Sequence, residues 1–439
     1  MSLFGTNGVR GVVNEELTAE MALDLGRVIA TFKPGKIAVA CDTRISSFML
    51  KAATLAGITS AGSVAIDLGI APTPALQYYV KINRIPGVVI TASHNPREYN
   101  GIKFIQENGA EFFREMDEES ERIYLSKKFK IARWDEVGTI VQDDCIDQYV
   151  NAIVDTVSLD KKYRLVVDCG NGASYITTPE ILKKLDCQVY SINCYPDGRF
   201  PARNPEPLEK ELEMLKKSVV NFNADFGVAH DGDADRAVFV NEKGEFVSED
   251  VMLALIAKYY VEKNGGGIVV TPVSSSRCVE DAVVSVGGKI IYTAVGSPVV
   301  AKVMLEKRAI FGGEGNGGFI FPEHLLARDG GMGIAKVLQL LDETGKKLSQ
   351  LVAEIPKYHM IKGKIECKNK EKVLSELKKL YPDANHVDGV RVDFEDGWIL
   401  IRPSGTEPIV RIYAEGKNKE RAEELYFESL KTVKGILNL

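Results

Sequence analysis

Two hydrophobic periods alternate along most of this chain. Short runs rich in valine and isoleucine are followed by longer segments with apolar residues at helical spacing, and then by another short apolar run. This order is typical of strand–helix–strand units. It recurs three times before the pattern changes near Lys362. The sequence therefore predicts an α/β fold with three tandem mixed α/β units and a C-terminal α+β domain.

The predicted elements follow from these runs. In the first unit they are strands at 36–39, 64–66 and 88–90 and helices at 47–61 and 74–82. In the second unit they are strands at 165–167, 189–192 and 226–229 and helices at 178–185 and 207–217. In the third unit they are helices at 250–262, 277–286 and 298–306 and strands at 268–270, 290–292 and 309–311. The last domain has strands at 390–392, 398–401 and 409–412 and helices at 370–380 and from 419.

Length and composition indicate a multidomain globular protein. A chain of 439 residues is too long for one hydrophobic core, and domains of ~100 to 200 residues imply two to four of them. Apolar residues make up 45% and charged residues 26% of the chain. We find no signal peptide and no membrane-spanning run, so we expect a cytoplasmic protein without a membrane partner.

Charge and cysteine usage narrow the class further. The 55 basic and 61 acidic residues give a formal net charge of −6, which argues against a broad nucleic-acid-binding surface. The chain has seven cysteines and no CxxC pair. We therefore expect reduced thiols, with neither disulfides nor a zinc site.

The first candidate for chemistry is a serine after the strand at 88–90. Ser93 and His94 belong to the run Thr-Ala-Ser-His-Asn-Pro, and the carboxyl end of such a strand is where open α/β sheets bind ligands. A hydroxyl needs a base, a metal or a positive field to act as a nucleophile, and His94 and Lys103 offer such help. The alternative is an ordinary turn, because serine, asparagine and proline are common turn residues.

The second candidate is an acidic loop. Asp231, Asp233 and Asp235 occupy every second position of Asp-Gly-Asp-Ala-Asp-Arg, a spacing that brings three carboxylates to one hard cation such as Mg²⁺. An EF-hand is excluded because its sixth position requires glycine and is Arg236 here. The alternative is a solvated acidic turn. If the loop binds a cation, we expect Arg236 to face a phosphate.

Two further loops suit a phosphate and a polyol. Arg402-Pro-Ser-Gly-Thr406 offers a fixed cation, two hydroxyls and exposed backbone N–H groups, with Arg411 on the next strand. A plain hairpin turn is the alternative. The glycine-rich segment 312–318 carries Glu314 and Asn316, side chains that can bind sugar hydroxyls. It lacks the nucleotide-binding patterns and would otherwise be a flexible turn.

These loops, one per predicted unit, together describe a protein that holds a phosphorylated sugar while it moves a phosphoryl group. Their order, with the opening Phe-Gly-Thr-Asn-Gly-Val-Arg-Gly at 4–11, resembles the α-D-phosphohexomutase family over essentially the whole chain. The resemblance implies a central cleft between four domains. These are a phosphoserine domain at 1–145, a metal-binding domain at 146–246, a sugar-binding domain at 247–358 and a phosphate-binding domain at 359–439.

The resemblance also assigns roles. Ser93 would carry a phosphoryl group and bind Mg²⁺ together with the three aspartates, and His94 and Lys103 would assist proton transfer. Arg10 would neutralise the transferring phosphate. The substrate-binding set would be Arg236, Gly296, Glu314, Asn316, Arg402, Ser404, Gly405, Thr406 and Arg411.

The implied reaction interconverts a hexose 6-phosphate and a hexose 1-phosphate, with a hexose 1,6-bisphosphate as intermediate and activator. The Glu-Gly-Asn-Gly-Gly run is similar to the loop of archaeal family members described as phosphoglucosamine mutases or phosphomannomutases. From this resemblance we expect glucosamine phosphate as substrate, in a monomer or homodimer. The alternatives are a phosphomannomutase or phosphoglucomutase, a serine-dependent sugar phosphatase, and a non-catalytic sugar-phosphate sensor.

Overall fold

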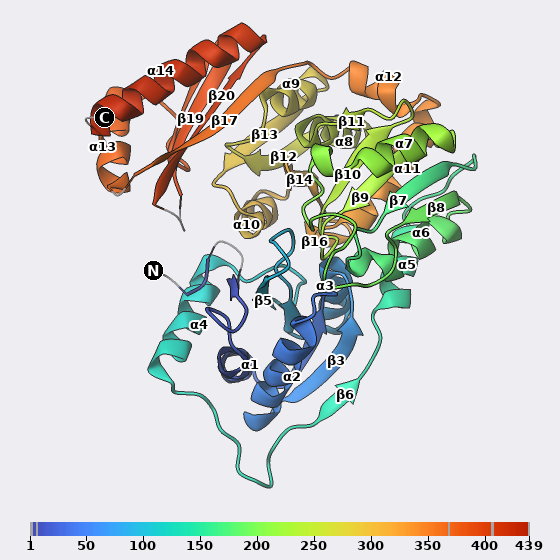
Figure 1. Ribbon diagram of the computed structural model, residues 1–439, viewed down its shortest axis with the longest axis vertical. Coiled ribbons are helices and arrows are strands. Elements are labelled where there is room, and N and C mark those ends of the chain that lie inside the picture. Colours follow the sequence, from blue (N-terminus) through green and yellow to red (C-terminus); the bar gives the residue numbers. More distant parts are fainter. Residues whose placement is uncertain (1–2, 6–7, 368, 405–407, 438–439) are drawn as a thin grey trace. The chain divides into compact units, whose positions relative to one another are not determined.

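The computed structural model describes residues 3–5, 8–367, 369–404 and 408–437 (Figure 1). The chain forms two compact units. One contains Ser2–Met252 and Asn316–Val352, and the other contains Leu253–Gly315 and Ala353–Leu439. Sheets flanked by helices in both units confirm the predicted α/β class.

The first unit opens with a six-stranded sheet in the order β1-β5-β4-β2-β3-β6. Its strands are β1 (Val9–Val12), β2 (Lys36–Cys41), β3 (Val64–Ile70), β4 (Gly87–Ile90), β5 (Tyr99–Ile105) and β6 (Ile140–Gln142). Strands β2, β3, β4 and β6 are parallel, whereas β5 is antiparallel to β4 and β1. The helices are α1 (Ala19–Phe32), α2 (Ser47–Ser60), α3 (Thr73–Asn83) and α4 (Arg114–Ser126). The sequence analysis missed β1, β5, β6, α1 and α4.

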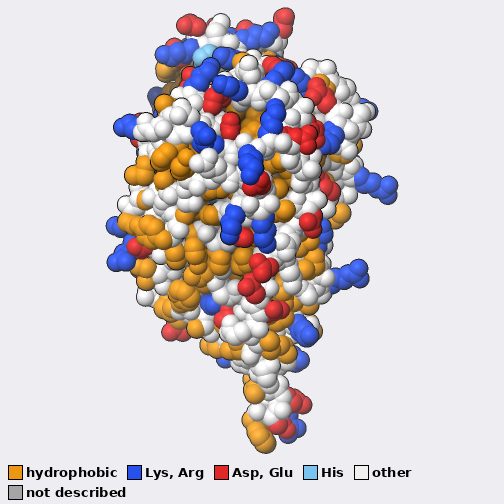
Figure 2. All heavy atoms as spheres, turned by 90° about the vertical axis from the view of Figure 1, so that its right-hand side faces the viewer, with side chains coloured by type: hydrophobic (Ala, Val, Ile, Leu, Met, Phe, Trp, Pro, Cys, Tyr) orange, Lys and Arg blue, Asp and Glu red, His pale blue; other side chains and the backbone are white. Residues whose placement is uncertain are grey.

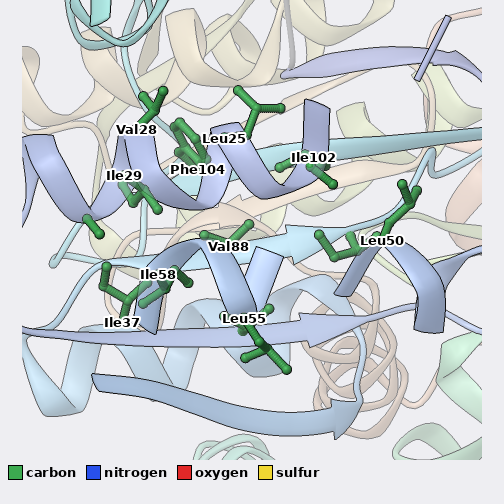
Figure 3. Packing of buried hydrophobic residues seen from close by; sticks show 14 of the residues in the cluster. Leu25, Val28, Ile29, Ile37, Leu50, Leu55, Ile58, Val88, Ile102 and Phe104 are labelled. Atoms are coloured by element: carbon green, nitrogen blue, oxygen red, sulfur yellow. The ribbon is translucent and has the colours of Figure 1, made fainter. Parts of the chain in front are cut away.

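Helices α1 and α2 supply much of the core of this sheet. Figure 3 shows Leu25 and Ile29 of α1 and Ile58 of α2 packing with strand residues such as Val88 and Phe104. The backbones of α1 and α2 approach each other closely at Gly57. A Cβ added to Gly57 would lie 2.1 Å from the Leu23 carbonyl oxygen.

A second, five-stranded sheet in the same unit has the order β11-β10-β9-β7-β8. Its strands are β7 (Arg164–Asp168), β8 (Gln188–Ile192), β9 (Phe226–His230), β10 (Ala237–Asn241) and β11 (Phe246–Val247). Its helices are α5 (Ile146–Val154), η1 (Ala173–Ile176), α6 (Thr178–Lys184), η2 (Glu209–Glu211) and α7 (Glu213–Asn221). The parallel strands β7 and β9 are buried apolar runs, as predicted, and the antiparallel strand β10 follows the acidic loop.

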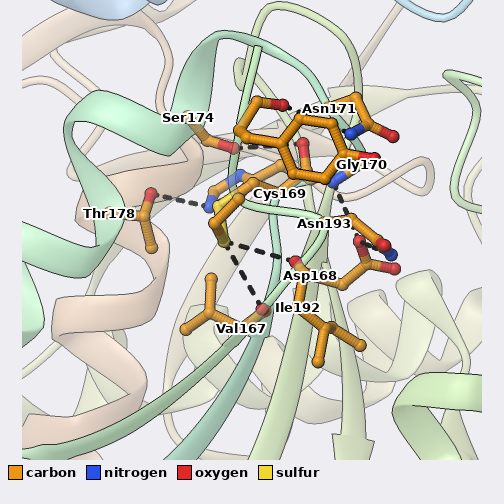
Figure 4. The surroundings of a disulfide bond; sticks show 12 residues. Val167, Asp168, Cys169, Gly170, Asn171, Ser174, Thr178, Ile192 and Asn193 are labelled. Carbon is orange, nitrogen blue, oxygen red and sulfur yellow. Dashed lines mark hydrogen bonds between the residues drawn. A yellow bond between two sulfur atoms is a disulfide. The ribbon is translucent and has the colours of Figure 1, made fainter. Parts of the chain in front are cut away.

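A disulfide joins the loops that follow β7 and β8. Cys169 and Cys194 are bonded, with Cα atoms 4.8 Å apart (Figure 4). The expectation of seven reduced thiols was therefore wrong for this pair. The parallel pairing of β7 and β8 places both strand ends at one edge of the sheet, which a separation of 25 residues does not reveal.

The first unit also contains a C-terminal segment of the predicted third unit. Antiparallel strands β15 (Gly318–Phe321) and β16 (Leu325–Arg328) lead into α11 (Gly330–Thr344). Asp329 caps α11 by accepting the Met332 N–H at 2.9 Å. These elements were also missed.

The second unit carries the parallel strands β12 (Gly267–Pro272), β13 (Gly288–Thr293) and β14 (Phe311–Glu314) in the order β13-β12-β14. Helices α9 (Arg277–Ser285) and α10 (Ser297–Lys307) belong to this unit, while α8 (Glu249–Asn264) and α12 (Leu348–Ala353) span the boundaries between the units. Part of the predicted flexible loop at 312–318 is thus strand. Gly312 lies within β14, where a Cβ would lie 2.3 Å from Met304 Sδ.

The chain ends in an antiparallel sheet in the order β17-β20-β19-β18. Its elements are β17 (His359–Glu366), α13 (Lys370–Leu380), β18 (Val390–Phe394), β19 (Gly397–Pro403), β20 (Ile409–Gly416) and α14 (Lys419–Leu437). Except for β17, which was missed, these elements match the predicted α+β domain.

Charges of both signs are interspersed on the face drawn in Figure 2, with apolar side chains between them. This distribution agrees with the nearly balanced numbers of basic and acidic residues. Among the described helices, none combines the length and the apolar character that crossing a bilayer requires.

Candidate active site

The serine loop begins where β4 ends. Ser93 is buried, and its backbone has a φ of +52°, in the left-handed region that non-glycine residues rarely adopt. The Ser93 N–H donates to Thr91 Oγ1 at 2.9 Å, and Thr91 Oγ1 donates to Asp42 Oδ2 at 2.7 Å. The loop is thus held by side chains of its own neighbourhood.

Arg44, which the sequence analysis did not select, fixes the same loop from outside. Its guanidinium donates to the carbonyl oxygens of Ser93 at 2.8 Å and Asn95 at 2.7 Å. It also donates to the carbonyl oxygens of Pro96 at 2.6 Å and Tyr99 at 2.9 Å. A fifth bond, at 3.0 Å, joins Arg44 Nε to Asp42 Oδ2. The planar fork of donors suits this set of acceptors.

The acidic loop joins β9 to β10 and brings the three predicted carboxylates together. One ligand oxygen each from Asp231, Asp233 and Asp235 lies within 4.8 Å of the others, and all three residues are buried. Gly232 permits the approach to the serine loop, since a Cβ there would lie 2.6 Å from the Ser93 carbonyl oxygen.

Ser93 and the acidic loop meet directly. Ser93 Oγ donates to Asp231 Oδ2 at 2.7 Å, whereas His94 Nδ1 lies 3.4 Å from the same hydroxyl. Burial and the charges of Asp235 and Asp233 raise the pKa of Asp231. In this arrangement Asp231 is the nearer acceptor for the serine proton.

Cations surround the triad. Lys103 Nζ lies 3.4 Å from Asp233 Oδ2 and 3.9 Å from Asp235 Oδ2, and Thr73 Oγ1 donates to Asp233 at 2.6 Å. Burial opposes ionisation of Asp233, but Lys103 and Thr73 outweigh it and its pKa is lowered. Asp233 is therefore ionised at neutral pH.

Arg10 and Arg236 flank the serine loop. Arg10 donates to Asn95 Oδ1 at 2.7 Å, and Arg236 Nη2 lies 3.0 Å from His94 Nδ1. Burial, followed by the positive charges of Arg236 and Arg10, lowers the pKa of His94 to about 2. His94 is thus neutral at physiological pH and can accept a hydrogen bond from Arg236.

The donor set suits a hard cation. Asp233 Oδ1 and Asp235 Oδ1 are buried and have no hydrogen-bond partner among the described residues, although buried carboxylate oxygens are normally satisfied. Oxygen-only ligands at this spacing are typical of Mg²⁺ or Ca²⁺ sites. The residues present therefore fit a bound divalent cation.

In the other unit, the predicted sugar loop is placed at the end of β14. Gly296 N–H donates to Glu314 Oε1 at 3.3 Å, so these two predicted binding residues are adjacent. Gly296 precedes α10 and has a φ of +135°, which favours glycine. Asn316 belongs to the first unit, where its Oδ1 accepts the Gly318 N–H at 3.1 Å.

The predicted phosphate clamp lies at the β19–β20 turn. Arg402 and Arg411 are direct cross-strand partners, so two like charges stand side by side. Arg402 pairs with Asp388 at 2.9 Å, and Asp388 also accepts the Val295 N–H at 3.0 Å. Ser404 closes the turn by donating its N–H to Ile409, while Gly405 and Thr406 lie outside the described residues.

Known proteins resemble this chain along most of its length. Family models for phosphoglucomutase/phosphomannomutase match the chain throughout: α/β/α domain I at residues 1–131, domain II at 147–244, domain III at 248–358 and the C-terminal domain at 363–428. A phosphoglucomutase/phosphomannomutase of Thermococcus kodakarensis is 45% identical over 439 residues, covering 96% of each chain. A probable phosphoglucosamine mutase of Methanopyrus kandleri is 43% identical, covering 98% of this chain and 97% of the relative.

Solved structures show the same fold. A phosphoglucomutase/phosphomannomutase family protein from Burkholderia thailandensis matches with a TM-score of 0.89 at 26% identity, covering 99% of this chain and 97% of that one. A putative phosphomannomutase from Thermus thermophilus matches with a TM-score of 0.83 at 27% identity, covering 98% of both chains. The chain belongs to the phosphoglucomutase/phosphomannomutase family, which confirms the resemblance to the α-D-phosphohexomutases. It is therefore a phosphohexomutase, an isomerase that works by phosphoryl transfer.

Proposed function

We propose that this phosphohexomutase converts glucosamine 6-phosphate to glucosamine 1-phosphate and that Ser93 carries the transferred phosphoryl group. The observation that carries this proposal is the 2.7 Å contact between Ser93 Oγ and Asp231, within the acidic triad. A serine buried in this way is positioned by Arg44 and Thr91. Phosphoryl transfer depends mainly on such positioning and on charge stabilisation.

In the proposed reaction, phosphorylated Ser93 gives its phosphoryl group to the free sugar hydroxyl of the 6-phosphate. The P–O bond to Ser93 breaks and a P–O bond to the sugar forms. The sugar proton passes to a base, and Ser93 Oγ takes up a proton as it leaves. The hexose 1,6-bisphosphate then reorients and returns its 6-phosphoryl group to Ser93. We assign proton transfer to His94 and Lys103, and charge neutralisation to Arg10 and Arg236. The same bisphosphate would activate unphosphorylated enzyme by loading Ser93.

We assign the divalent cation to Asp231, Asp233, Asp235 and phosphorylated Ser93, and identify it as Mg²⁺. When bound, Mg²⁺ would neutralise negative charge on the transferring phosphoryl group. The Asp233 and Asp235 oxygens that lack a hydrogen-bond partner among the described residues support this assignment.

We assign the non-reacting phosphate to Arg402, Ser404, Gly405, Thr406 and Arg411. The cross-strand placement of Arg402 and Arg411 supports this choice, because two guanidinium groups on neighbouring strands suit a phosphate dianion. The four parts of the chain would then act as a phosphoserine domain at 1–145, a metal-binding domain at 146–246, a sugar-binding domain at 247–358 and a phosphate-binding domain at 359–439.

The choice of sugar rests on Glu314, Asn316 and Gly296. A carboxylate next to a backbone N–H suits a ligand with both donors and acceptors, and a protonated amino group would add attraction to Glu314. Relatives such as the Methanopyrus protein are named probable phosphoglucosamine mutases. The 45% identity to a phosphoglucomutase/phosphomannomutase makes glucose and mannose phosphates the second candidate.

The decisive experiment is a parallel mutase assay on glucosamine, glucose and mannose 6-phosphates, with Mg²⁺ and a trace of hexose 1,6-bisphosphate. We expect the highest kcat/KM with glucosamine 6-phosphate and loss of turnover in Ser93→Ala, with Ser126→Ala on exposed α4 as the control. A higher kcat/KM with glucose or mannose phosphate would replace the proposed substrate. Release of free phosphate would indicate a phosphatase, and binding without turnover would indicate a sensor.

A further inference from the structure

Arg328 is a cation beside the acidic triad, and it lies outside every motif that the sequence analysis recognised. It ends strand β16 and is 5% exposed. Its Nη2 atom lies 2.5 Å from Asp235 Oδ2, although 93 residues separate the two in sequence. One of the three proposed metal ligands is therefore held by an arginine from a different part of the chain.

The local structure keeps Arg328 in place. Its cross-strand partner is Ile320 of β15, and a Cβ added to Gly318 would lie 2.3 Å from Arg328 Cδ. Gly318 thus leaves the space that the arginine stem occupies. The next residue, Asp329, caps α11 and accepts the Tyr149 hydroxyl at 2.7 Å. Arg328 therefore projects from a rigid support and not from a mobile loop.

Arg328 shares its acidic partner with another cation. Lys103 Nζ lies 3.9 Å from the same Asp235 oxygen and 3.4 Å from Asp233 Oδ2. Arg328 therefore belongs to the group of charges beside the Ser93–Asp231 contact.

The charges around this contact balance when Arg328 is included. Apart from the Arg44–Asp42 pair, four cations face four carboxylates among the described residues. The cations are Arg10, Lys103, Arg236 and Arg328, and the carboxylates are Glu111, Asp231, Asp233 and Asp235. Glu111 enters the set through Lys103, whose Nζ lies 3.7 Å away. A phosphoserine with a charge near −2 and a divalent cation would together add no net charge to this set.

We infer that Arg328 is a positioning residue for phosphoryl transfer, which orients Asp235 and keeps the loaded site electrically balanced. This inference rests on the proposed function, because it requires the metal and phosphoryl group at this site. Arg328 acts through Asp235 and through the local field. A purely structural strut between β16 and the acidic loop is the competing role.

The two roles differ in their response to Mg²⁺. Without Arg328, Asp235 loses a competing positive charge, so Mg²⁺ should bind more tightly while transfer becomes slower. A strut would instead lower thermal stability and leave the Mg²⁺ response unchanged.

Arg328→Gln removes the charge, and Arg328→Lys retains it without the planar fork. Arg164→Gln is the matched control, since Arg164 donates to the Phe222 and Asn223 carbonyl oxygens away from the acidic loop.

The experiment measures Tm with and without Mg²⁺ by calorimetry, and kcat and KM for the preferred hexose 6-phosphate. For Arg328→Gln we expect a larger Mg²⁺-induced rise in Tm than in the wild type, and a kcat lower by about 100-fold with little change in KM. Arg328→Lys should restore the wild-type Mg²⁺ response and recover only part of kcat. Arg164→Gln should lower Tm alone.

An unchanged Mg²⁺ response in Arg328→Gln, or a kcat close to that of the wild type, would overturn the inference. If Arg328→Gln does not fold, the inference stands or falls on Arg328→Lys. A wild-type Mg²⁺ response together with a reduced kcat supports the inference, and full kcat refutes it. Failure of the proposed function has a different signature, because the wild type itself would then show no Mg²⁺ stabilisation or no mutase turnover.

Discussion

At the scale of single residues, Arg44 fixes the backbone of the loop that contains Ser93, the proposed carrier of the phosphoryl group. Its guanidinium donates five hydrogen bonds to protein acceptors, and the arginine is fully buried. Lysine has three donors on a point charge and cannot reproduce a five-donor fork. Each buried acceptor left without a donor costs about 1–3 kcal/mol.

We therefore expect Arg44→Lys to lower the free energy of unfolding by about 2–4 kcal/mol and to lower kcat at least about tenfold through misplacement of Ser93. Denaturant unfolding and mutase kinetics would measure the two effects. The control is Arg114→Lys, whose side chain is 79% exposed and should be neutral. A variant with wild-type stability and kcat would show that Arg44 does not hold the loop.

The same residues explain what sequence reasoning could find. Ser93 and His94 are adjacent in sequence, and the three aspartates occupy alternate positions of one loop. Each group was therefore recognisable as a local pattern. Arg44 and Arg328 act on partners 52 and 93 residues away. Nothing in the local sequence of either arginine identifies these distant partners, and only the fold brings them together.

At the scale of elements, the crossing of α1 and α2 depends on two glycines. Gly26 and Gly57 face each other: a Cβ on Gly26 would lie 2.3 Å from the Thr54 carbonyl oxygen, and one on Gly57 would lie 2.1 Å from that of Leu23. Both obstacles are backbone atoms, which cannot rotate away. The helices would have to separate, and this would disturb the core shown in Figure 3.

Gly57→Ala should therefore destabilise the protein by about 1–3 kcal/mol or more, although alanine is the better helix former by about 1 kcal/mol. Gly435→Ala on α14 is the matched control, because among the described residues no atom lies within 4 Å of the Cβ position apart from those of the chain neighbours and the backbone of the same helix. There we expect a small gain in Tm. Equal effects of the two substitutions in thermal unfolding would contradict close packing of α1 against α2.

The disulfide between the β7 and β8 loops supports both halves of the proposed site. Cys169 is followed by Asn171, whose carbonyl oxygen accepts the Thr43 hydroxyl at 2.9 Å, next to Arg44. Further along the same loop, the Ala173 N–H donates to the Gly232 carbonyl oxygen at 2.9 Å, inside the acidic loop. Loosening this segment would therefore affect the Arg44 clamp and the aspartates together.

A loop closed over 25 residues corresponds to about 3.5 kcal/mol of stabilisation in the chain-entropy model. We expect a dithiol reductant to lower Tm and kcat. The double variant Cys169→Ser/Cys194→Ser should reproduce both losses and no longer respond to the reductant, whereas Cys187→Ser should respond as the wild type does. Equal Tm values for oxidised and reduced protein, with the redox state verified by mass spectrometry, would refute this role.

At the scale of the whole molecule, hydrophobic periodicity was sufficient for the α/β class and for parallel strands such as β2, β4 and β9, because these strands are continuous buried runs. It missed the parallel strand β6, whose residues are exposed. It missed β5, β10 and β15, each of which pairs antiparallel with a strand next to it in the chain. It also missed α4, which buries little of its surface. It also gave no sign that the glycine-rich segment at 312–318 divides between two units.

This division leads to a test of how the proposed site is distributed. Ser93, the three aspartates and Arg328 all belong to the unit formed by Ser2–Met252 and Asn316–Val352, whereas Arg402 and Arg411 belong to the other. A ligand stabilises the unit that binds it, by about 2.7 kcal/mol when the ligand concentration is 100 times the dissociation constant.

We therefore expect calorimetry to resolve two unfolding transitions. Mg²⁺ should raise the temperature of one transition, and inorganic phosphate that of the other. Asp233→Asn should abolish the Mg²⁺ shift alone, and Arg411→Gln the phosphate shift alone. A single transition that both ligands raise would mean that the two units unfold together, and a Mg²⁺ shift that survives Asp233→Asn would place the cation elsewhere.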